Sequence, residues 1–463
     1  MLEAAVARGN ITPPLDIPNG MWVAQRHVRG EGLHQELWVT ALYLKDGDQE
    51  VIVLDFDLCI LSDQQAVDIR QTVSKATGVD PDRVVPCCTH NHAGPVTQDT
   101  YLGEGADRVR DYVKTLPAAA AGAARTAQLN STPVRLAAGS GHSEIGLNRD
   151  LTLDTGRIVA GPNPEGFADQ EVGVLRLDTL DGEPLVCIVN YACHPTVLGP
   201  ANKLISPDFP GTTKRTIEAL TGATCVFLQG ASGNMGPREG FVGDRLVAEK
   251  LGRELGLEAA KVFLSLDSRG VRRELKEVLE SGAPLTQYQE VPLDEPAPRL
   301  ALHSTRLRLP LRKPVPELFG KAQERLEASE KEYQRLDAQG VPADALAKAL
   351  QEVERERLRA SRAWKYVDKE SDEVELHVLS LGQVAVVFMW GEPYSQIGAQ
   401  VKENSPYAHT LFTGYVGGDS TYIATPDVFL EQPPFEVENC PFAPEAAQVA
   451  VDTSLELLRK SIR

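Results

Sequence analysis

Short apolar runs alternate with longer amphipathic stretches along most of the chain. Helices are predicted at 62–78, where Ser62 can cap the start and Gly78 the end, and at 106–129, 208–221, 244–264 and from about 444. Alternation of this kind predicts an α/β fold, a layered α/β/α sandwich around a mixed sheet. Buried strands are predicted at 36–45, 51–58, 83–88, 134–138, 172–177, 185–191, 224–229, 373–381 and 384–390.

Residues 315–370 depart from this pattern. They are rich in Glu, Lys, Arg, Ala and Leu, and Gly340–Pro342 interrupts them. The pattern predicts a surface hairpin of two charged amphipathic helices, inserted into a single domain that spans residues 1–463. A solvated decoration or a contact for homo-oligomerisation accounts for this hairpin more simply than a catalytic role does.

Composition and charge narrow the function classes. Hydrophobic residues make up 42% of 463, which supports a substantial core. The formal net charge is -18 and no basic cluster stands out, so a nucleic-acid partner is not expected. The N-terminus lacks the pattern of a secretory signal, and no run of 18 apolar residues occurs. We therefore expect a cytoplasmic protein without stable membrane insertion.

The seven cysteines do not form a recognisable metal or disulfide motif. Their number is odd, no C-x-x-C occurs, and most lie inside apolar runs. This distribution is typical of reduced, buried thiols.

Polar residues capable of chemistry follow several of the predicted strands. A glutamate directly after an apolar strand is costly to bury unless it is paired or coordinated. Histidines and carboxylates gathered at strand ends are what a metal site requires. The loops in question are T-H-N-H-A-G-P at 89–95 with His90 and His92, N-Y-A-C-H-P-T at 190–196 with His194, F-L-Q-G-A-S-G-N-M-G-P at 227–237, and the loop after 384–390 with Glu392.

Each of these residues also has an ordinary structural interpretation, because a lone histidine after a strand is more often hydrogen-bonded than metal-bound. The pair is more informative, since residues i and i+2 of extended backbone face the same way and His90 and His92 could reach one centre. The H-x-H pattern also occurs in metallo-β-lactamases as H-x-H-x-D-H. Here Ala93, Gly94 and Pro95 follow, which excludes that family.

Taken together, the loops resemble the neutral/alkaline ceramidase family in its catalytic domain. The matching segments appear in the family's order and span nearly the whole chain, which makes the set specific for the superfamily but not for ceramide as the substrate. They are I-T-P-P at 11–14, T-H-N-H-A-G-P at 89–95, L-N-R at 147–149, N-Y-A-C-H-P-T at 190–196, S-P-D-F-P-G at 206–211, G-E-P at 391–393 and T-Y-I-A-T at 421–425.

The resemblance implies one zinc ion per chain. It implies the zinc ligands His90, His194, Glu392 and Tyr422, the last of which the residue pattern alone would assign to a strand or core. It also implies that His92 acts near the metal as an acid or base, and that Arg149 in L-N-R holds a carbonyl or carboxylate of the substrate.

The segment G-N-M-G-P at 233–237 departs from the family's G-D-V-S-P-like segment. Gly236 occupies the serine position and Asn234 replaces the aspartate, although a shifted alignment would place Ser232 there. We interpret Asn148, Ser232 and Asn234 as candidate substrate-binding residues.

Two further departures concern the C-terminal part. Pro434 or Phe435 stands where the family has a second tyrosine, and the family's C-terminal β-sandwich domain has no counterpart in the chain. The leading hypothesis is therefore a zinc-dependent hydrolase that cleaves an amide in a small-molecule substrate smaller or more polar than ceramide. The alternatives are the same metal site acting on an ester, lactone or carbohydrate-derived substrate, and a non-catalytic relative that binds a ligand.

Overall fold

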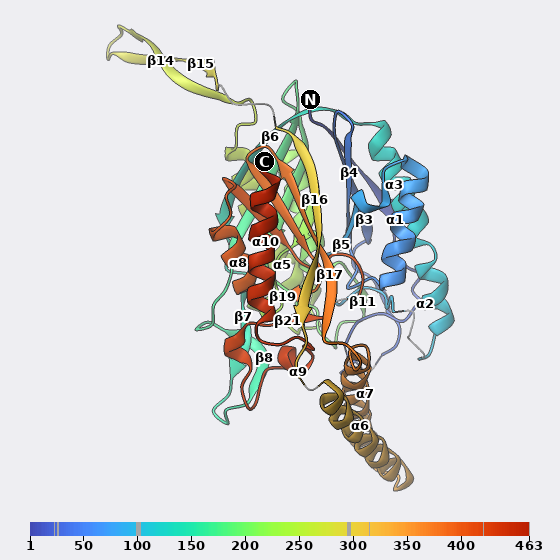
Figure 1. Cartoon of the computed structure of the whole chain (residues 1–463). Coiled ribbons are helices and arrows are strands. Elements are labelled where there is room, and N and C mark those ends of the chain that lie inside the picture. The colour runs from blue at the N-terminus through green and yellow to red at the C-terminus, as the bar shows by residue number, and fades with distance from the viewer. Residues whose placement is uncertain are drawn as a thin grey trace.

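The computed structural model describes residues 1–22, 24–25, 27–98, 103–293, 298–313, 315–419 and 421–462. An eight-stranded sheet forms its centre (Figure 1). The pairs β12–β10 and β4–β5 are parallel and the other neighbours are antiparallel, which confirms the predicted mixed α/β fold. In spatial order the strands are β12 (Thr224–Gln229), β10 (Pro184–Tyr191), β9 (Glu171–Thr179), β6 (Thr132–His142), β1 (Glu3–Asn10), β3 (Trp38–Asp46), β4 (Gln49–Phe56) and β5 (Val84–Cys88).

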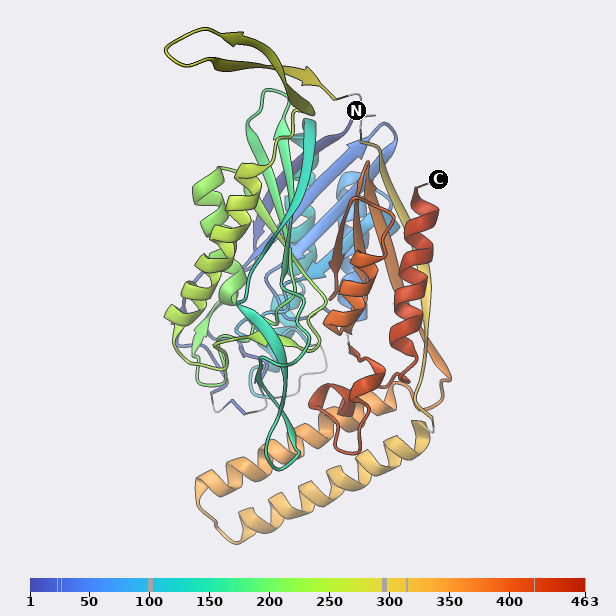
Figure 2. The same cartoon turned by 90° about the vertical axis from the view of Figure 1, so that its left-hand side faces the viewer.

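Helices cover one face of this sheet (Figure 2). Ser62 caps α1 through a capping box with Gln65, and Gly78 ends the helix in the left-handed conformation, as the sequence predicts. One group of helices packs on β1 and β3–β5, and the other packs on β9, β10 and β12. The first group is α1 (Asp63–Thr77), α2 (Ala106–Val113) and α3 (Leu116–Leu129), and the second is α4 (Asp208–Thr221) and α5 (Arg245–Ser265).

The stretch 106–129, predicted as one helix, is two helices, α2 and α3. The break falls at Lys114 and Thr115, just before Pro117 in the first turn of α3. Proline has no backbone N–H to donate, so it is tolerated in a first turn but not in the interior of a continuous helix.

A second sheet of four strands packs against the other face of the eight-stranded sheet. Alternate residues of both sheets form one apolar layer, which includes Leu42, Val53, Leu177, Val386 and Phe388. Two helices cover the outer face of the second sheet, so the layers run helix, sheet, sheet, helix. The strands are β16 (Leu300–Pro310), β17 (Ser371–Leu381), β18 (Val384–Met389) and β20 (His409–Thr413), and the helices are α8 (Ser395–Glu403) and α10 (Ala446–Ser461).

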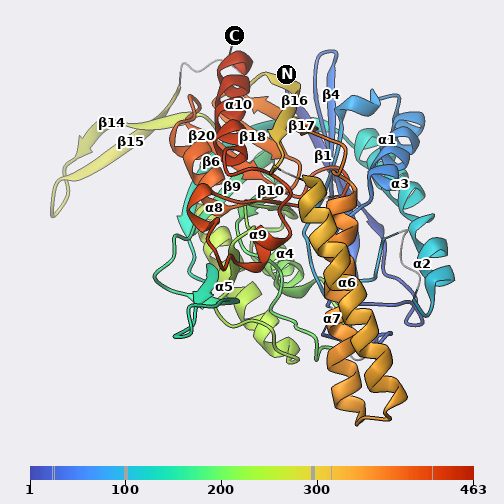
Figure 3. The ribbon, with the colours of Figure 1, turned by 60° about the horizontal axis from the view of Figure 1, so that its bottom comes forward.

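Two hairpins project from this body. The helical hairpin of α6 (Val315–Ala338) and α7 (Ala343–Trp364) lies between β16 and β17 in the sequence and extends away from the sheets (Figure 3). A two-stranded ribbon, β14 (Val271–Leu279) and β15 (Leu285–Pro292), projects at the opposite end in Figure 1.

The remaining elements are short and surround the strand ends. None of the described helices is both long and apolar enough to cross a bilayer. The short elements are β2 (Gly32–Leu33), η1 (Pro81–Arg83), β7 (Gly146–Thr152), β8 (Ile158–Asn163), β11 (Leu204–Ile205), β13 (Met235–Pro237), β19 (Glu392–Pro393), β21 (Tyr422–Ile423), η2 (Pro426–Val428) and α9 (Phe435–Glu438).

The carboxyl ends of β5, β10, β12 and β18 are joined by backbone hydrogen bonds. The N–H of Gly230 donates to the carbonyl of Tyr191, and the N–H of Gly414, just after β20, donates to the carbonyl of Gln229. The N–H of Tyr415 donates to the carbonyl of Gly391, and the carbonyl of Tyr415 accepts from the N–H of Cys88 at the end of β5. Because these bonds tie the two sheets at the same end, the loops that follow the four strands lie side by side, and they carry His90, His194, Ser232 and Glu392.

Candidate metal centre

His90 is held in the loop after β5 by both its backbone and its ring. Its φ of 64° is uncommon for a residue other than glycine. Its N–H donates to the carbonyl of Leu58 (2.9 Å), and its Nδ1 donates to the carbonyl of Cys59 (2.8 Å). With Nδ1 committed to that carbonyl, Nε2 is the ring nitrogen left to face the interior.

His194 is fixed in the same way in the loop after β10. Its Nδ1 lies 2.7 Å from the carbonyl oxygen of Ser232. The ring is buried, and burial together with the nearby Arg149 guanidinium lowers the pKa of His194 to about 3. The imidazole is therefore neutral, with its proton on Nδ1 and a lone pair on Nε2.

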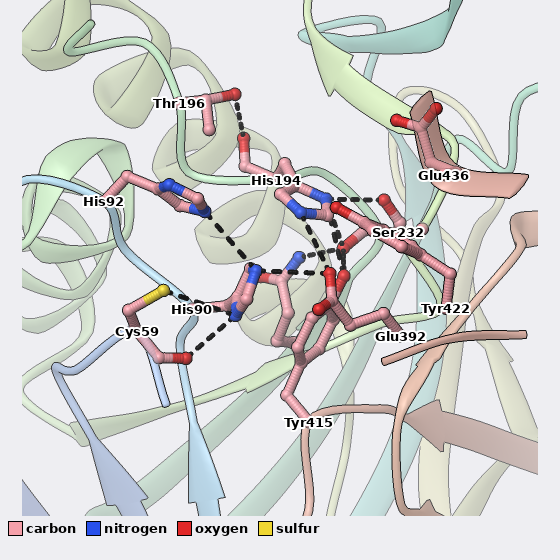
Figure 4. Close-up of polar contacts among 12 residues, drawn as sticks. Cys59, His90, His92, His194, Thr196, Ser232, Glu392, Tyr415, Tyr422 and Glu436 are labelled. Carbon is pink, nitrogen blue, oxygen red and sulfur yellow. Dashed lines mark hydrogen bonds and ion pairs between the residues drawn. The ribbon is translucent and has the colours of Figure 1, made fainter. Parts of the chain in front are cut away.

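The Glu392 carboxylate lies between these two rings. Its Oε2 is 3.4 Å from Nε2 of His90 and 3.4 Å from Nε2 of His194, and all three side chains are buried (Figure 4). Burial on its own would raise the pKa of Glu392, but the two histidines outweigh this effect and hold it well below the usual value. An ionised carboxylate therefore faces the lone pair of a neutral imidazole, a repulsive arrangement that a cation would relieve.

Two cations could occupy this place. The first is a proton on His90: burial lowers the pKa of His90, but Cys59 and Glu392 together raise it to about 10. A proton on His90 would satisfy one contact and leave the Nε2 of His194 facing the carboxylate. A metal ion would satisfy all three groups. Two ligand atoms at about 2.0–2.1 Å from a tetrahedral zinc ion are about 3.3–3.4 Å apart, so the donor set and its spacing fit zinc.

Tyr422 is brought next to Glu392 by short strands. β19 and β21 pair in parallel with Glu392 opposite Tyr422. The Tyr422 hydroxyl accepts a hydrogen bond from Nη2 of Arg149 (3.2 Å), and its ring packs edge-on against Phe435 at 6.2 Å between centroids. A cationic donor on the phenol oxygen favours the deprotonated form that a metal ligand requires.

The guanidinium of Arg149, predicted to hold substrate, is engaged within the protein. Its Nη2 donates to the carbonyl of Gly233 (2.8 Å) and lies 2.8 Å from Oε1 of Glu436. Burial lowers the pKa of Arg149, but Glu436 and Tyr422 outweigh this effect and raise it, so the charge is retained. These contacts support a role in positioning Tyr422, and direct contact of Arg149 with substrate stays a prediction.

His92 lies beside the cluster rather than inside it. Its Nε2 is 3.4 Å from Nε2 of His90, and its ring packs against Trp22 at 5.0 Å between centroids. Burial, followed by the proximity of His90 and His194, lowers its pKa well below the usual value, so the ring is neutral. Its buried Nδ1 has no hydrogen-bond partner among the described residues. The role of His92 as an acid or base stays a prediction.

The three residues predicted to bind substrate are buried and hydrogen-bonded to the protein. Ser232 Oγ accepts from Nε2 of Gln229 (2.7 Å). The Asn234 side chain joins two loops, with Nδ2 donating to Gln396 (2.9 Å) and Oδ1 accepting from the N–H of Ser395 (2.8 Å). Asn148 Nδ2 donates to the carbonyl of Phe167 (3.1 Å). These bonds favour a role in holding the loops, and contact with substrate stays a prediction.

Sequence reasoning missed Tyr415, which is buried against both histidines. Its ring lies 4.2 Å from that of His90 between centroids, and its hydroxyl is 2.8 Å from Ser232 Oγ and 3.4 Å from Nδ1 of His194. Its φ is 58°, so it occupies a strained turn directly after β20. The available signal was an aromatic residue in T-G-Y-V-G-G at a strand end, which is weak on its own.

A cluster of buried charged residues is hydrogen-bonded to the loop that carries His90. Lys214 Nζ lies 2.6 Å from Oδ2 of Asp55 and 2.9 Å from Oδ1 of Asp57. The carbonyl of Asp57 accepts a hydrogen bond from Nδ2 of Asn91 (2.7 Å), which stands between the two histidines of T-H-N-H. Asp57 therefore positions the histidine loop through its backbone, while its side chain neutralises a buried lysine.

Asp208 fixes the start of α4, because its Oδ1 accepts a hydrogen bond from the N–H of Phe209 (2.6 Å). It is the first residue of α4, with Pro207 at the cap position. Its Oδ2 accepts from the N–H of Leu198 (2.8 Å), in the same segment as His194.

Comparison with known proteins places these features in context. No protein-family model matches the chain. Neutral ceramidase of Pseudomonas aeruginosa is 27% identical over 222 residues, which are 44% of this chain and 32% of that protein. The match thus spans about a third of the relative's length.

Solved structures match over a longer region. The crystal structure of neutral ceramidase from Pseudomonas aeruginosa has a TM-score of 0.67 and 18% identity, covering 99% of this chain and 75% of that one. A ceramidase complexed with C2 has a TM-score of 0.66 and 17% identity, with the same coverage. The chain is therefore a distant relative of neutral ceramidase and shares its fold over almost all of its own length.

Proposed function

We propose that the chain is a zinc-dependent hydrolase that cleaves an amide bond. The observation that carries the proposal is the convergence of two histidine Nε2 atoms on one oxygen of an ionised carboxylate, at 3.4 Å each, with both Nδ1 atoms held by backbone carbonyls. The similarity to neutral ceramidase supports amide hydrolysis, because ceramide is an N-acyl compound.

His90, His194 and Glu392 would hold the zinc ion, with Tyr422 as a fourth ligand. A bound zinc ion would polarise a carbonyl group and lower the pKa of water beside it. The chain itself fixes the ligands before a metal binds. The backbone carbonyls of Cys59 and Ser232 orient the rings of His90 and His194, and Arg149 donates a hydrogen bond to the Tyr422 hydroxyl.

We further propose that His92 moves the proton that amide hydrolysis requires. A water oxygen adds to the carbonyl carbon, the C–N bond breaks, and the leaving nitrogen takes a proton to become an amine. His92 would accept the proton from water and deliver it to that nitrogen, because its ring is neutral and borders the cluster. The products are a carboxylic acid and an amine.

Metal analysis tests the proposal most directly. Protein purified without chelator should contain about one zinc ion per chain by plasma mass spectrometry. Glu392→Gln and His194→Ala should each lose the metal and lower kcat/KM for an N-acyl amide by more than about 100-fold. His409→Ala is the matched control, because His409 is exposed and lies on β20 away from the cluster. Zinc retained at full stoichiometry in both variants would refute the assigned ligand set.

A further inference from the structure

A cavity of about 720 Å³ lies between the turn before β8, the base of the α6–α7 hairpin and the segment that contains α9. Figure 3 shows α9 close to the base of α6 and α7. Among the described residues, two acidic ones, Glu431 and Glu438, line the cavity. They are outnumbered by cationic residues, namely Arg157, Arg312, Lys321, Arg325, Arg355 and Arg359. In a chain with a net charge of -18, such a concentration of positive charge is unexpected.

Within the described part of the chain, acidic partners neutralise only some of these arginines. Arg355 pairs with Glu352, and Arg359 pairs with Glu356 and Glu438. Arg157 and Arg325 have no side-chain hydrogen bond or ion pair with any other described residue.

Two of the other arginines lack a full complement of partners as well. Arg312 donates from Nη1 to a neutral group, the carbonyl of Val437 (3.0 Å). Nε of Arg359 is buried without a hydrogen-bond partner among the described residues. A concave wall with excess positive charge attracts anions, and the planar guanidinium forks match carboxylate, phosphate or sulfate oxygens.

The cavity shares one structural wall with the candidate metal centre, the short helix α9. Phe435 lines the cavity and packs on the ring of Tyr422. The next residue, Glu436, pairs with Arg149, whose guanidinium also contacts the Tyr422 hydroxyl. Phe435 and Glu436 thus connect the wall of the cavity to residues assigned to the candidate metal centre.

We infer that this cavity binds an anionic group of the substrate, a carboxylate, phosphate or sulfate. The inference rests on the proposed function and narrows its substrate class. A volume of about 720 Å³ is within the range of small-molecule sites. Guanidinium groups form stronger, charge-assisted hydrogen bonds with an anion than with the neutral carbonyl of a lipid amide. An N-acyl compound with an acidic substituent would carry both groups that these two neighbouring sites are proposed to bind.

Calorimetric titration with inorganic phosphate and with sulfate, at low ionic strength, tests the binding site. The full chain should bind at least one of the two. The double variant Arg157→Gln/Arg325→Gln should bind at least about tenfold more weakly, because each lost contact is a hydrogen bond to a charged group. Arg335→Gln is the matched control: Arg335 lies on α6, pairs with Glu332 outside the cavity, and should leave affinity unchanged. Glu392→Gln should also bind the anion normally, which separates this site from the metal.

Kinetics then tests whether the anion belongs to the substrate. Phosphate should compete with an N-acyl amide that carries a carboxylate. The double variant should raise KM for that amide by about tenfold with little change in kcat, and it should not affect a neutral analogue.

The two hypotheses fail in different ways. Equal phosphate affinity in wild type and the double variant, or binding without competition, would overturn the anionic-substrate inference and leave the hydrolase proposal intact. Arginine-dependent phosphate binding in a protein that hydrolyses no amide would refute the proposed function and leave the anion site standing.

Discussion

At the scale of single residues, the candidate metal centre depends on which ring nitrogen of each histidine is hydrogen-bonded to the backbone. Nδ1 of His90 donates to the backbone carbonyl of Cys59, and Nδ1 of His194 donates to the backbone carbonyl of Ser232. Both Nε2 atoms are therefore directed at Glu392 before any metal binds. The position of the Ser232 carbonyl is set in turn by Gly233, whose N–H donates to the carbonyl of Pro393 (2.8 Å). The loop that orients His194 is thereby fixed against the loop that carries Glu392.

Gly233→Ala should therefore weaken metal binding. A Cβ at Gly233 would lie 2.6 Å from the carbonyl oxygen of Glu392, which forces the two loops apart. We expect zinc affinity to fall by about 10–100-fold, by competition with a chelator, while circular dichroism stays native.

Gly122→Ala is the control for Gly233→Ala. A Cβ at Gly122 meets nothing within 4 Å, and alanine should stabilise the interior of α3 by about 0.5–1 kcal/mol. Unchanged zinc affinity in Gly233→Ala would show that this close contact does not set the ligand geometry.

The sequence predicted the histidines and the glutamate but not their supports. His90, His194 and Glu392 follow apolar runs that sequence reasoning can find, and the structure brings them together. Tyr415 and Glu436 are buried by contacts between segments distant in sequence, and the local sequence marks Tyr415 only weakly and Glu436 not at all. The basic cavity could not be predicted for the same reason: Arg157 is distant in the chain from Arg312 and Arg325, and the fold brings these residues together.

At the scale of elements, the sequence predicted what capping and alternation encode. Both ends of α1 follow from Ser62 and Gly78, and the strands β4, β10 and β12 follow from apolar runs. The first strand, β1, was missed because E-A-A-V-A-R-G-N contains weak strand formers, and its pairing with β3 across the sheet determines its conformation.

An ion pair ties α1 to the second sheet. Arg70 on α1 donates from Nη1 to Oε1 of Glu375 on β17 (2.8 Å), with a second contact through Nη2. Burial on its own would raise the pKa of Glu375, but hydrogen bonds from His377 and Arg70 outweigh it and hold the pKa far below the usual value. The folded pKa lies below the unfolded one, so this stabilisation is present above the unfolded pKa and is lost as the pH falls.

Arg70→Gln should reduce the free energy of unfolding by about 1–2 kcal/mol at neutral pH. The difference from wild type should shrink as the pH drops below about 4, where Glu375 becomes protonated in the unfolded chain. Urea unfolding of both proteins at several pH values measures this difference in the free energy of unfolding. The exposed pair Arg108–Asp16 supplies a control, since Arg108→Gln should lower the free energy of unfolding by about 0.5 kcal/mol or less. An equal loss at pH 3 and pH 7 would contradict an electrostatic origin.

At the scale of the whole molecule, strand-helix alternation indicated the class but not the two facing sheets. Strands at 373–381 and 384–390 were predicted, yet nothing in their sequences says which sheet they join. Their place in the second sheet is determined by the apolar layer between the sheets, which includes Leu177 and Val386 and forms only when both sheets are complete. Because the strands divide into two sheets, His90 and His194 follow strands of the larger sheet and Glu392 follows a strand of the smaller one.

The β14–β15 ribbon lies between these two parts in the sequence. Nearly all of its residues are exposed, and it extends away from both sheets (Figure 1). An isolated two-stranded hairpin is marginally stable in water, so the ribbon should open far more often than the body. Limited trypsin digestion of the native protein should cut first at Arg272, Arg273 or Lys276, and the two fragments should stay associated through the core between the sheets.

A cut in this ribbon converts the chain into a two-part system suited to fragment complementation. The N-terminal polypeptide would carry the whole larger sheet with His90 and His194, and the C-terminal polypeptide would carry Glu392 and Tyr422. Residues 1–280 and 284–463, produced from separate genes in one cell, should co-purify, and zinc should be retained only by the pair. Independent purification of the two halves would show that the ribbon is needed for assembly. If they recombine, metal content becomes a direct readout of the reunion of two polypeptides, because neither one carries a complete set of ligands.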